Sequence, residues 1–373
     1  MRKIQYLSAL LVPVFCVSCA APKQYSVDEY RTVMQFHEDF KVAQFTDLHL
    51  GFESNLSEQL TFIQKSMLES KADLFVFTGD NFMFANKSIV NATLSMINVT
   101  CDKLTSERTD GLVTKFAITY GNHDNQGEYN KFYINDTVKK FVTSDGKEKE
   151  LKKYAAFLDY NDDNLFGYTN YFIDLVDDVA KDKETVDVKY RLHILDSNTY
   201  HFNGIKYSYD VIHEDQLEHI NNIYTTATND KDYIGLAFFH IPFEEFEIAK
   251  LQYENAANPE DFGRGEFGEG VSDPYENNGS FTKMRGANIV GYFVGHDHVN
   301  ASDLLYNADS SNVEDKAIFS YGVKSTNQLY HENDKIGYKE ITLKDNMSIE
   351  DFLTTENINN NIKNVENRGG LYE

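Results

Sequence analysis

The sequence predicts an α/β protein, in which sheets are packed between layers of helices. Short apolar or β-branched runs of strand length recur along the chain, and amphipathic segments with a helical period lie between some of them. Polar clusters follow directly after several of the runs. Strands that alternate with helices favour an α/β architecture over an all-α or all-β one.

Eight segments have the length and composition of strands. They are 42–46, 74–78, 116–119, 192–195, 233–239, 289–294, 317–321 and 336–343. A helix is predicted after the first of them, because Leu60, Ile63 and Leu68 fall on one side of a helical period. A second helix is predicted over 214–223 for the same reason.

One domain is predicted over residues 38–345, since no internal repeat and no clear linker interrupts it. Residues 125–190 are rich in acidic side chains and are expected to form a surface insertion. Residues 346–373 carry little apolar content and are expected to form a loose polar tail.

The first residues, 1–21, have the pattern of a secretory signal peptide. Arg2 and Lys3 are followed by a mostly apolar run over 6–17 and then by small residues. The run is too short to span a bilayer, which takes about 20 residues. The pattern predicts that the protein is exported.

A lipid anchor is the expected fate of the exported chain. Residues 17–20, Val-Ser-Cys-Ala, resemble a bacterial lipobox, which would make Cys19 the lipidated first residue of a membrane-anchored surface lipoprotein. Cys16 stands where Leu is usual, and ordinary cleavage after Ala20 or Ala21 would release a secreted protein instead.

The composition and net charge limit which molecules the protein is expected to bind. Of 373 residues, 41% are hydrophobic, which is typical of a globular protein, and the net charge is −24. A surface with this negative charge repels the phosphate backbone of a nucleic acid. Strong nucleic-acid binding is therefore not expected. Hydrolysis of a phosphate ester stays open, because bound metal ions can reverse the field locally.

Five clusters of metal-binding residue types follow apolar runs. They are Asp-Leu-His at 47–49, Gly-Asp-Asn at 79–81, Gly-Asn-His-Asp at 121–124, His240, and Gly-His-Asp-His at 295–298. Ligands bind beyond the carboxyl ends of strands in an open α/β sheet. Carboxylates and imidazoles suit Zn, Fe and Mn ions. A single Asp-x-His, a Gly-Asp turn or a lone His is weak evidence, but all five clusters together predict a metal site.

The order of these clusters resembles that of the calcineurin-like metallophosphoesterases, from about residue 42 to residue 300. The segments 238–242 and 295–300 resemble the branch related to purple acid phosphatases. The resemblance implies a four-layer αββα sandwich, with two mixed sheets flanked by helices and a dinuclear metal site at the strand ends. Met83 stands where the coloured enzymes have a Tyr, so no tyrosinate–iron absorption band is expected.

The resemblance also implies roles for the residues. One ion would be held by Asp47, His49 and His298. The other would be held by Asn122, His240 and His296. Asp80 would bridge the two, since a carboxylate has two oxygens. The ions would be divalent or trivalent Mn, Fe or Zn, and no other cofactor is implied.

The activity implied is hydrolysis of phosphate esters, most of all monoesters, by in-line attack of a hydroxide that bridges the metals. His123 would assist the leaving group, and Asp124 would orient His123, unless Asp124 is a simple turn acid. A phosphodiesterase or nuclease on the same site is one alternative. A non-catalytic surface lipoprotein that retains the fold is the other.

Overall fold

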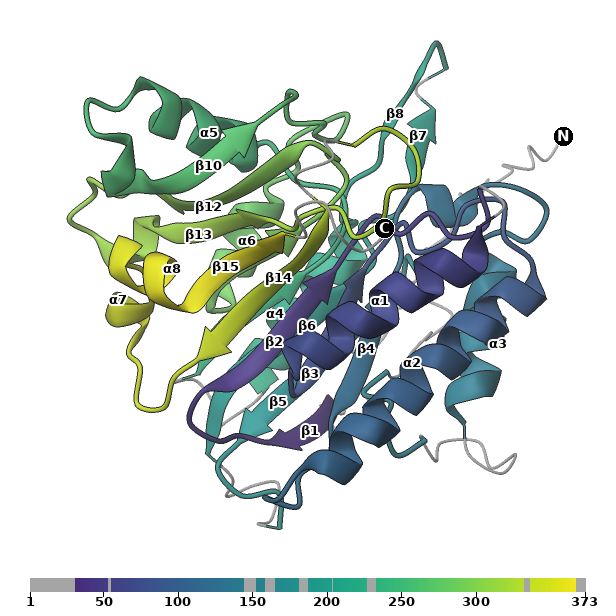
Figure 1. Cartoon of the computed structure of the whole chain (residues 1–373). Helices are drawn as coiled ribbons and strands as arrows, with labels where there is room; N and C mark the ends of the chain where they lie inside the picture. The colour runs from purple at the N-terminus through teal and green to yellow at the C-terminus, as the bar shows by residue number, and fades with distance from the viewer. Residues whose placement is uncertain are drawn as a thin grey trace, which may run out of the picture.

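Two large β-sheets lie face to face, with helices on their outer faces (Figure 1). The computed structural model describes residues 31–366 apart from 53–54, 144–151, 158–164, 181–186, 203, 227–232 and 332–335. In the described residues, no helix combines the length and the apolar character that a membrane span requires.

The first sheet has eight strands and is mixed. In spatial order they are β1 (Arg31–Gln35), β5 (Asn170–Val176), β6 (Val188–Leu195), β9 (Ile234–Phe238), β11 (Ile289–Val294), β13 (Ala317–Tyr321), β12 (Asn300–Tyr306) and β10 (Gly263–Phe267). The central strands β6, β9, β11 and β13 are parallel, while β5, β12 and β10 introduce antiparallel pairs.

The second sheet has five strands and is also mixed. Their order is β15 (Ile362–Glu366), β14 (Gly337–Leu343), β2 (Phe40–Phe45), β3 (Leu74–Thr78) and β4 (Lys115–Thr119). Strands β2, β3 and β4 are parallel, so their carboxyl ends meet at one edge. A separate two-stranded hairpin consists of β7 (Tyr200–Phe202) and β8 (Tyr207–Tyr209).

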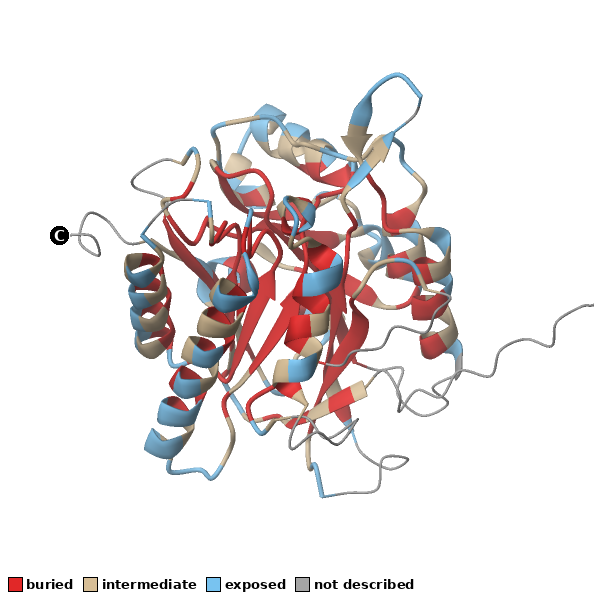
Figure 2. Ribbon diagram, turned by 90° about the vertical axis from the view of Figure 1, so that its right-hand side faces the viewer, coloured by how far each residue is buried: buried red, intermediate tan, exposed pale blue. Residues whose placement is uncertain are grey.

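Helices complete the outer layers. On the five-stranded side lie α1 (Leu56–Ser70), α2 (Lys87–Glu107) and α3 (Lys131–Val142). On the eight-stranded side lie α4 (Glu214–Thr226), α5 (Glu245–Asn255) and α6 (Ser280–Gly286). Short helices α7 (Ile349–Phe352) and α8 (Thr355–Asn361) precede β15, and single 3₁₀ turns are η2 (His123–Asn125), η3 (Pro259–Phe262) and η4 (Val313–Asp315). Each layer presents one apolar face to the next, which is why the central strands of both large sheets are almost entirely buried (Figure 2).

Two buried hydrogen bonds join the sheets near the edge where the parallel strands end. Gln44 Nε2 on β2 donates to the carbonyl oxygen of Val294 on β11 at 3.0 Å. Thr119 Oγ1 on β4 donates to the carbonyl oxygen of Leu195 on β6 at 2.7 Å. Since buried polar groups need partners, these bonds fix the strand ends of one sheet against those of the other.

The predicted four-layer α/β architecture is confirmed. Every one of the eight predicted strand segments overlaps a strand of the structure, and the two predicted helices correspond to α1 and α4. These elements were predictable because their apolar periodicity is strong and because the layers bury it.

The surface insertion predicted over 125–190 is wrong for much of that segment. It contains α3 and also β5, which is buried at all seven positions between β1 and β6. The prediction fails because acidic residues flank β5 in the sequence, although the strand itself is apolar. Its one acid, Asp174, is neutralised by Arg31 and Arg191 in the fold.

The predicted domain bounds are too narrow at both ends. Strand β1 precedes residue 38 and pairs with β5. The predicted loose tail contains α7, α8 and β15 as far as residue 366, and β15 extends the five-stranded sheet by pairing with β14. The predicted signal peptide and Cys19 lie outside the described residues.

Candidate metal centre

The predicted ligands come from both sheets and meet at their shared edge. Strands β2, β3 and β4 end just before the clusters at 47–49, 79–81 and 121–124. Strands β9 and β11 end just before His240 and the cluster at 295–298. The segments are therefore brought together by the parallel strand ends, as the sequence predicts.

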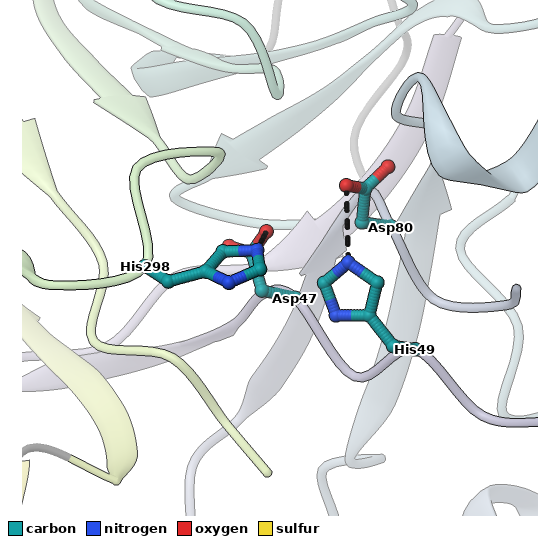
Figure 3. A group of neighbouring side chains, drawn as sticks. All are labelled: Asp47, His49, Asp80 and His298. Carbon is teal, nitrogen blue, oxygen red and sulfur yellow. Dashed lines mark ion pairs between the residues drawn. The ribbon is translucent and has the colours of Figure 1, made fainter. Parts of the chain in front are cut away.

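One group of four buried side chains has its ligand atoms within 4.8 Å of one another. It consists of Asp47, His49, Asp80 and His298 (Figure 3). His49 Nε2 lies 3.3 Å from Asp80 Oδ2, and His298 Nε2 lies 3.4 Å from Asp47 Oδ1. Imidazole nitrogens and carboxylate oxygens converge on a common point, which is the arrangement that a cation needs.

A second group shares the same carboxylate. Asp80, His240 and His296 are buried with ligand atoms within 4.8 Å of one another, and His240 Nε2 lies 3.0 Å from Asp80 Oδ2. Asn122, the other predicted ligand of this ion, donates from Nδ2 to Tyr200 Oη at 2.8 Å, and its buried Oδ1 has no hydrogen-bond partner. Asp80 thus stands in both groups, which fits a bridging ligand.

The unpaired polar atoms of the centre test whether metal ions fit there. Six buried ligand atoms have no hydrogen-bond partner: Asp47 Oδ1, His49 Nε2, Asp80 Oδ2, Asn122 Oδ1, His240 Nε2 and His296 Nε2. The only short contacts of four of them, on Asp47, His49, Asp80 and His240, are ion pairs within the centre itself. Burying polar atoms without hydrogen bonds is costly, so native proteins rarely do it. Each is on a predicted ligand and each is the atom that a cation would engage, so the residues fit a dinuclear metal centre.

Backbone strain is concentrated at the same ligands. Four of the seven have a left-handed backbone although none is glycine: Asp47 (φ 58°), His49 (φ 49°), Asp80 (φ 49°) and His296 (φ 81°). Each such residue costs about 1–3 kcal/mol and persists only where the surroundings enforce it. Gly121 serves a different need, because a Cβ there would overlap Asp80 Oδ1 and the ring of His240.

Further hydrogen bonds orient the ligands. His240 Nδ1 donates to the carbonyl oxygen of Thr78 at 3.1 Å, and His298 Nδ1 donates to that of Tyr330 at 3.0 Å. Both rings therefore direct Nε2 into the centre. Thr46 Oγ1 donates to Asp47 Oδ2 at 2.8 Å, which leaves Oδ1 for a cation. Such supporting contacts fix the tautomer and the angle of a metal ligand.

Several of these supporting residues were missed by sequence reasoning. Lys324 is buried, and its Nζ lies 3.0 Å from His49 Nδ1 and donates to the Asp47 carbonyl oxygen at 2.9 Å. Tyr330 stacks on His298 with ring centroids 4.3 Å apart. No motif marks either residue. The one available signal was that Lys324 closely follows the predicted strand 317–321, at the same edge of the sandwich.

The side chains of His123 and Asp124 make different contacts. His123 lies beside the shared carboxylate, with Nε2 3.9 Å from Asp80 Oδ2, and its side chain is 22% exposed. Asp124 instead accepts the backbone N–H groups of Phe82 and Gly121, at 2.8 Å each, while His123 Nδ1 has no hydrogen-bond partner. The carboxylate holds the turn rather than the imidazole, which corrects the expected role of Asp124 and supports its interpretation as a turn acid.

Burial and neighbouring charges move the pKa values of the ligands in opposite directions. Burial lowers the pKa of His49 to about 3, and the Lys324 cation adds to this effect. Burial also lowers the pKa of His296 to about 3. At His240 burial again favours the neutral form, but the Asp80 and Asp47 carboxylates outweigh it and raise the pKa to about 9. A pKa of about 9 makes the imidazolium cation, with protons on both ring nitrogens, the favoured form of His240 at pH 7 when no metal is bound.

We expect metal binding to displace one proton of the His240 imidazolium. The apparent affinity for Mn²⁺ should rise about tenfold per pH unit between pH 6 and 8 and level off above about pH 9, because only neutral imidazole can be a ligand. Isothermal titration calorimetry in buffers of different ionisation enthalpy should record release of about one proton when both ions bind. An affinity that does not change with pH, with no proton release, would contradict this assignment of His240.

The fold and the site together define a class. Two sets of Asp and His ligands that share one carboxylate, at the common edge of two sheets, form a dinuclear metal-binding centre. The sequence model of the calcineurin-like phosphoesterases matches residues 40–300, and the chain belongs to this family.

Known proteins similar to the chain include phosphatases. Phosphatase DCR2 of Saccharomyces cerevisiae is 27% identical over 278 residues, which are 70% of this chain but 44% of the yeast protein, so the chain spans less than half of that relative. Probable inactive purple acid phosphatase 29 of Arabidopsis thaliana is 24% identical over 80% of this chain and 78% of its own length. A dimetal phosphatase from Danio rerio, among solved structures, aligns with a TM-score of 0.47 and 12% identity, over 83% of this chain and 94% of its own.

Proposed function

We propose that the protein is a metal-dependent hydrolase of phosphate monoesters. The observation that carries the proposal is the set of six buried ligand atoms without a hydrogen-bond partner, five of which belong to the two groups that share Asp80. Two cations held there would bind the oxygens of a phosphate ester and lower the pKa of the attacking water. The chain supplies the ligands, the orientation and a proton donor.

His123 is the proton donor in this mechanism. Its Nε2 lies beside Asp80, and its side chain is the one partly exposed among the predicted site histidines. An ester bound at the centre would therefore be able to reach Nε2. As water attacks phosphorus in line, the bond to the leaving oxygen breaks, and His123 Nε2 passes a proton to that oxygen. Asp124 keeps His123 in place through the backbone of the turn.

Hydrolysis of p-nitrophenyl phosphate tests the proposal. Residues 22–373 are treated with a chelator and assayed with and without Mn²⁺, and bis-p-nitrophenyl phosphate is assayed in parallel. Metal-dependent release of p-nitrophenolate from the monoester, faster than from the diester, is the expected result. A faster reaction with the diester would instead support the phosphodiesterase alternative.

His123→Asn should slow esters with poor leaving groups most. A general acid contributes about 10²–10⁴-fold, and its loss matters more when the leaving oxygen is more basic. We expect a fall of about 10³-fold in kcat for phenyl phosphate and a clearly smaller fall for p-nitrophenyl phosphate. Metal content is measured to confirm that both ions are retained. Equal losses with the two esters would refute a role as proton donor.

A second candidate function is a non-catalytic protein that retains the centre. The names of two Arabidopsis relatives, purple acid phosphatases 29 and 14, include the word inactive, which favours this candidate. It predicts that the metal-loaded protein hydrolyses neither the monoester nor the diester. The presence of all seven predicted ligands favours the hydrolase.

Export is part of the proposal and is supported by the sequence pattern alone. The apolar run over 6–17 with the small residues after it favours a cleaved leader, and Cys19 favours a lipid anchor. Mass spectrometry of the mature protein should find a diacylglyceryl-modified Cys19 as the first residue. An unmodified N-terminus just after Ala20 or Ala21 would mean that the protein is secreted without an anchor.

A further inference from the structure

The hairpin β7–β8 carries four aromatic side chains on one face. The strands pair Tyr200 with Tyr209 and Phe202 with Tyr207, and residues two apart on a strand share a face. The ring centroids of the first pair lie 5.7 Å apart and those of the second 4.8 Å. We call these four side chains the aromatic face.

The inner pair of the aromatic face touches the metal centre. Tyr200 Oη accepts a hydrogen bond from Asn122 Nδ2 at 2.8 Å. The Tyr209 ring meets the His296 ring edge-to-face, with centroids 4.3 Å apart. The two tyrosines thus contact Asn122 and His296, two of the predicted ligands of one ion. The aromatic face therefore begins beside the place where a bound phosphate would lie.

The outer pair is open to solvent. Phe202 is 52% exposed and Tyr207 is 71% exposed, on a hairpin that stands away from the two large sheets (Figure 1). At about 3.4 Å per residue, these rings lie about 7 Å further from the ligands than the inner pair. Exposed large aromatic side chains grouped in this way mark a binding surface in soluble proteins.

The back of the hairpin is anchored, so the aromatic face is held in place. His201, on the opposite face, stacks on Tyr275 with centroids 3.9 Å apart. The backbone N–H of Tyr275 donates to the carbonyl oxygen of Tyr209 at 3.0 Å. A fixed platform binds a planar group at a lower entropic cost than a mobile one.

A groove beside the hairpin leaves room for a leaving group. Its lining includes Tyr200, from the aromatic face, and Asn125, which is two residues beyond His123 in the chain. Phe166 lines it further along and is stacked on His213 with centroids 3.7 Å apart. The group that departs from phosphorus would therefore lie between aromatic surfaces.

We propose that the aromatic face is the leaving-group subsite, and that it selects phosphate monoesters whose alcohol carries a planar ring, as in a nucleotide. This inference rests on the proposed function, because it places the ester on the metal centre. Aromatic side chains stack on any flat ring, since each ring presents a π-face. A phosphate monoester whose alcohol carries no planar ring gains no stacking energy from the aromatic face.

Adenosine 5′-monophosphate and ribose 5-phosphate provide the test. They share the primary alcohol that leaves and differ in the base. We expect kcat/KM to be about 10-fold higher for the nucleotide, as one stacked base contributes. In the double variant Phe202→Ser/Tyr207→Ser this ratio should fall about 10-fold. Phe132→Ser removes an exposed aromatic side chain from α3 and should leave the ratio unchanged.

Two outcomes would overturn the inference. One is equal kcat/KM for the two esters in the unmodified protein, and the other is a ratio that stays the same in the double variant. If the metal-loaded protein hydrolyses no ester at all, the proposed function fails by itself. Calorimetric titration with adenosine 5′-monophosphate then tests the subsite separately: a Kd about 10-fold weaker in the double variant supports it, and an unchanged Kd refutes it.

Discussion

Asp80→Asn is expected to reduce metal-dependent hydrolysis of p-nitrophenyl phosphate by about 10³-fold, because metal ions contribute several kcal/mol to stabilising the transition state. Asp80 is the one residue common to both ligand groups, and its buried Oδ2 lies 3.3 Å from His49 Nε2 and 3.0 Å from His240 Nε2. The amide keeps the shape but removes the negative charge that holds two cations close together. We expect the metal content to fall below two ions per chain, as measured by plasma mass spectrometry.

Asp136→Asn is the matched control for this variant. Asp136 is exposed on α3 and pairs with Lys140 one turn away, so the same substitution should change neither rate nor metal content. Circular dichroism would confirm that both variants are folded. An Asp80→Asn protein that keeps two ions and the full rate would rule out Asp80 as the bridging ligand.

Asp174→Ala is expected to have the largest effect on stability, about 3–5 kcal/mol, because it removes the carboxylate that neutralises two buried guanidinium groups. Asp174 is fully buried on β5 and accepts hydrogen bonds from Arg191 Nε at 2.7 Å and Nη2 at 3.0 Å. Its other contact is an ion pair with Arg31 Nε at 2.7 Å. Since these residues lie on β1, β5 and β6, one carboxylate joins three strands. Urea denaturation followed by circular dichroism measures the loss.

Asp136→Ala again provides the comparison, since an exposed pair within one helix contributes only about 0.3–0.5 kcal/mol. A loss below about 1 kcal/mol for Asp174→Ala would mean that the arginines find water or other partners when the carboxylate is gone. The buried ion pairs would then have no large part in holding β1 and β5 in the sheet.

The errors in the sequence-based prediction share a physical cause. The sequence predicts a surface insertion at strand β5, because a short apolar run between acidic stretches resembles a solvated segment. In the fold, Arg31 and Arg191 neutralise Asp174, and the strand is buried. Strand β15 contains Lys363 and Asn364 and has no apolar pattern, yet its backbone completes the sheet beside β14. Edge strands are stabilised by pairing as much as by burial, and pairing leaves little trace in a sequence.

The role of Asp124 shows the same limit at the level of one side chain. Its place next to His123 favours a carboxylate–imidazole pair, but neighbours along a chain need not face each other. In the fold both of its oxygens accept backbone N–H groups, and burial together with the Asp80 charge raises its pKa to about 7. Which atom a carboxylate contacts depends on backbone angles that adjacency does not encode.

The sequence by itself determined the layered α/β class and the predicted metal ligands, because apolar periodicity and rare residue clusters are local properties of the chain. Only the tertiary structure decided how those ligands are supported and what surrounds them. Lys324 reaches His49 across 275 residues, and Tyr200 on a separate hairpin meets Asn122. Contacts between distant segments arise from packing of the whole molecule. These contacts determine how the ligands are oriented and, in the proposal, which substrate is selected.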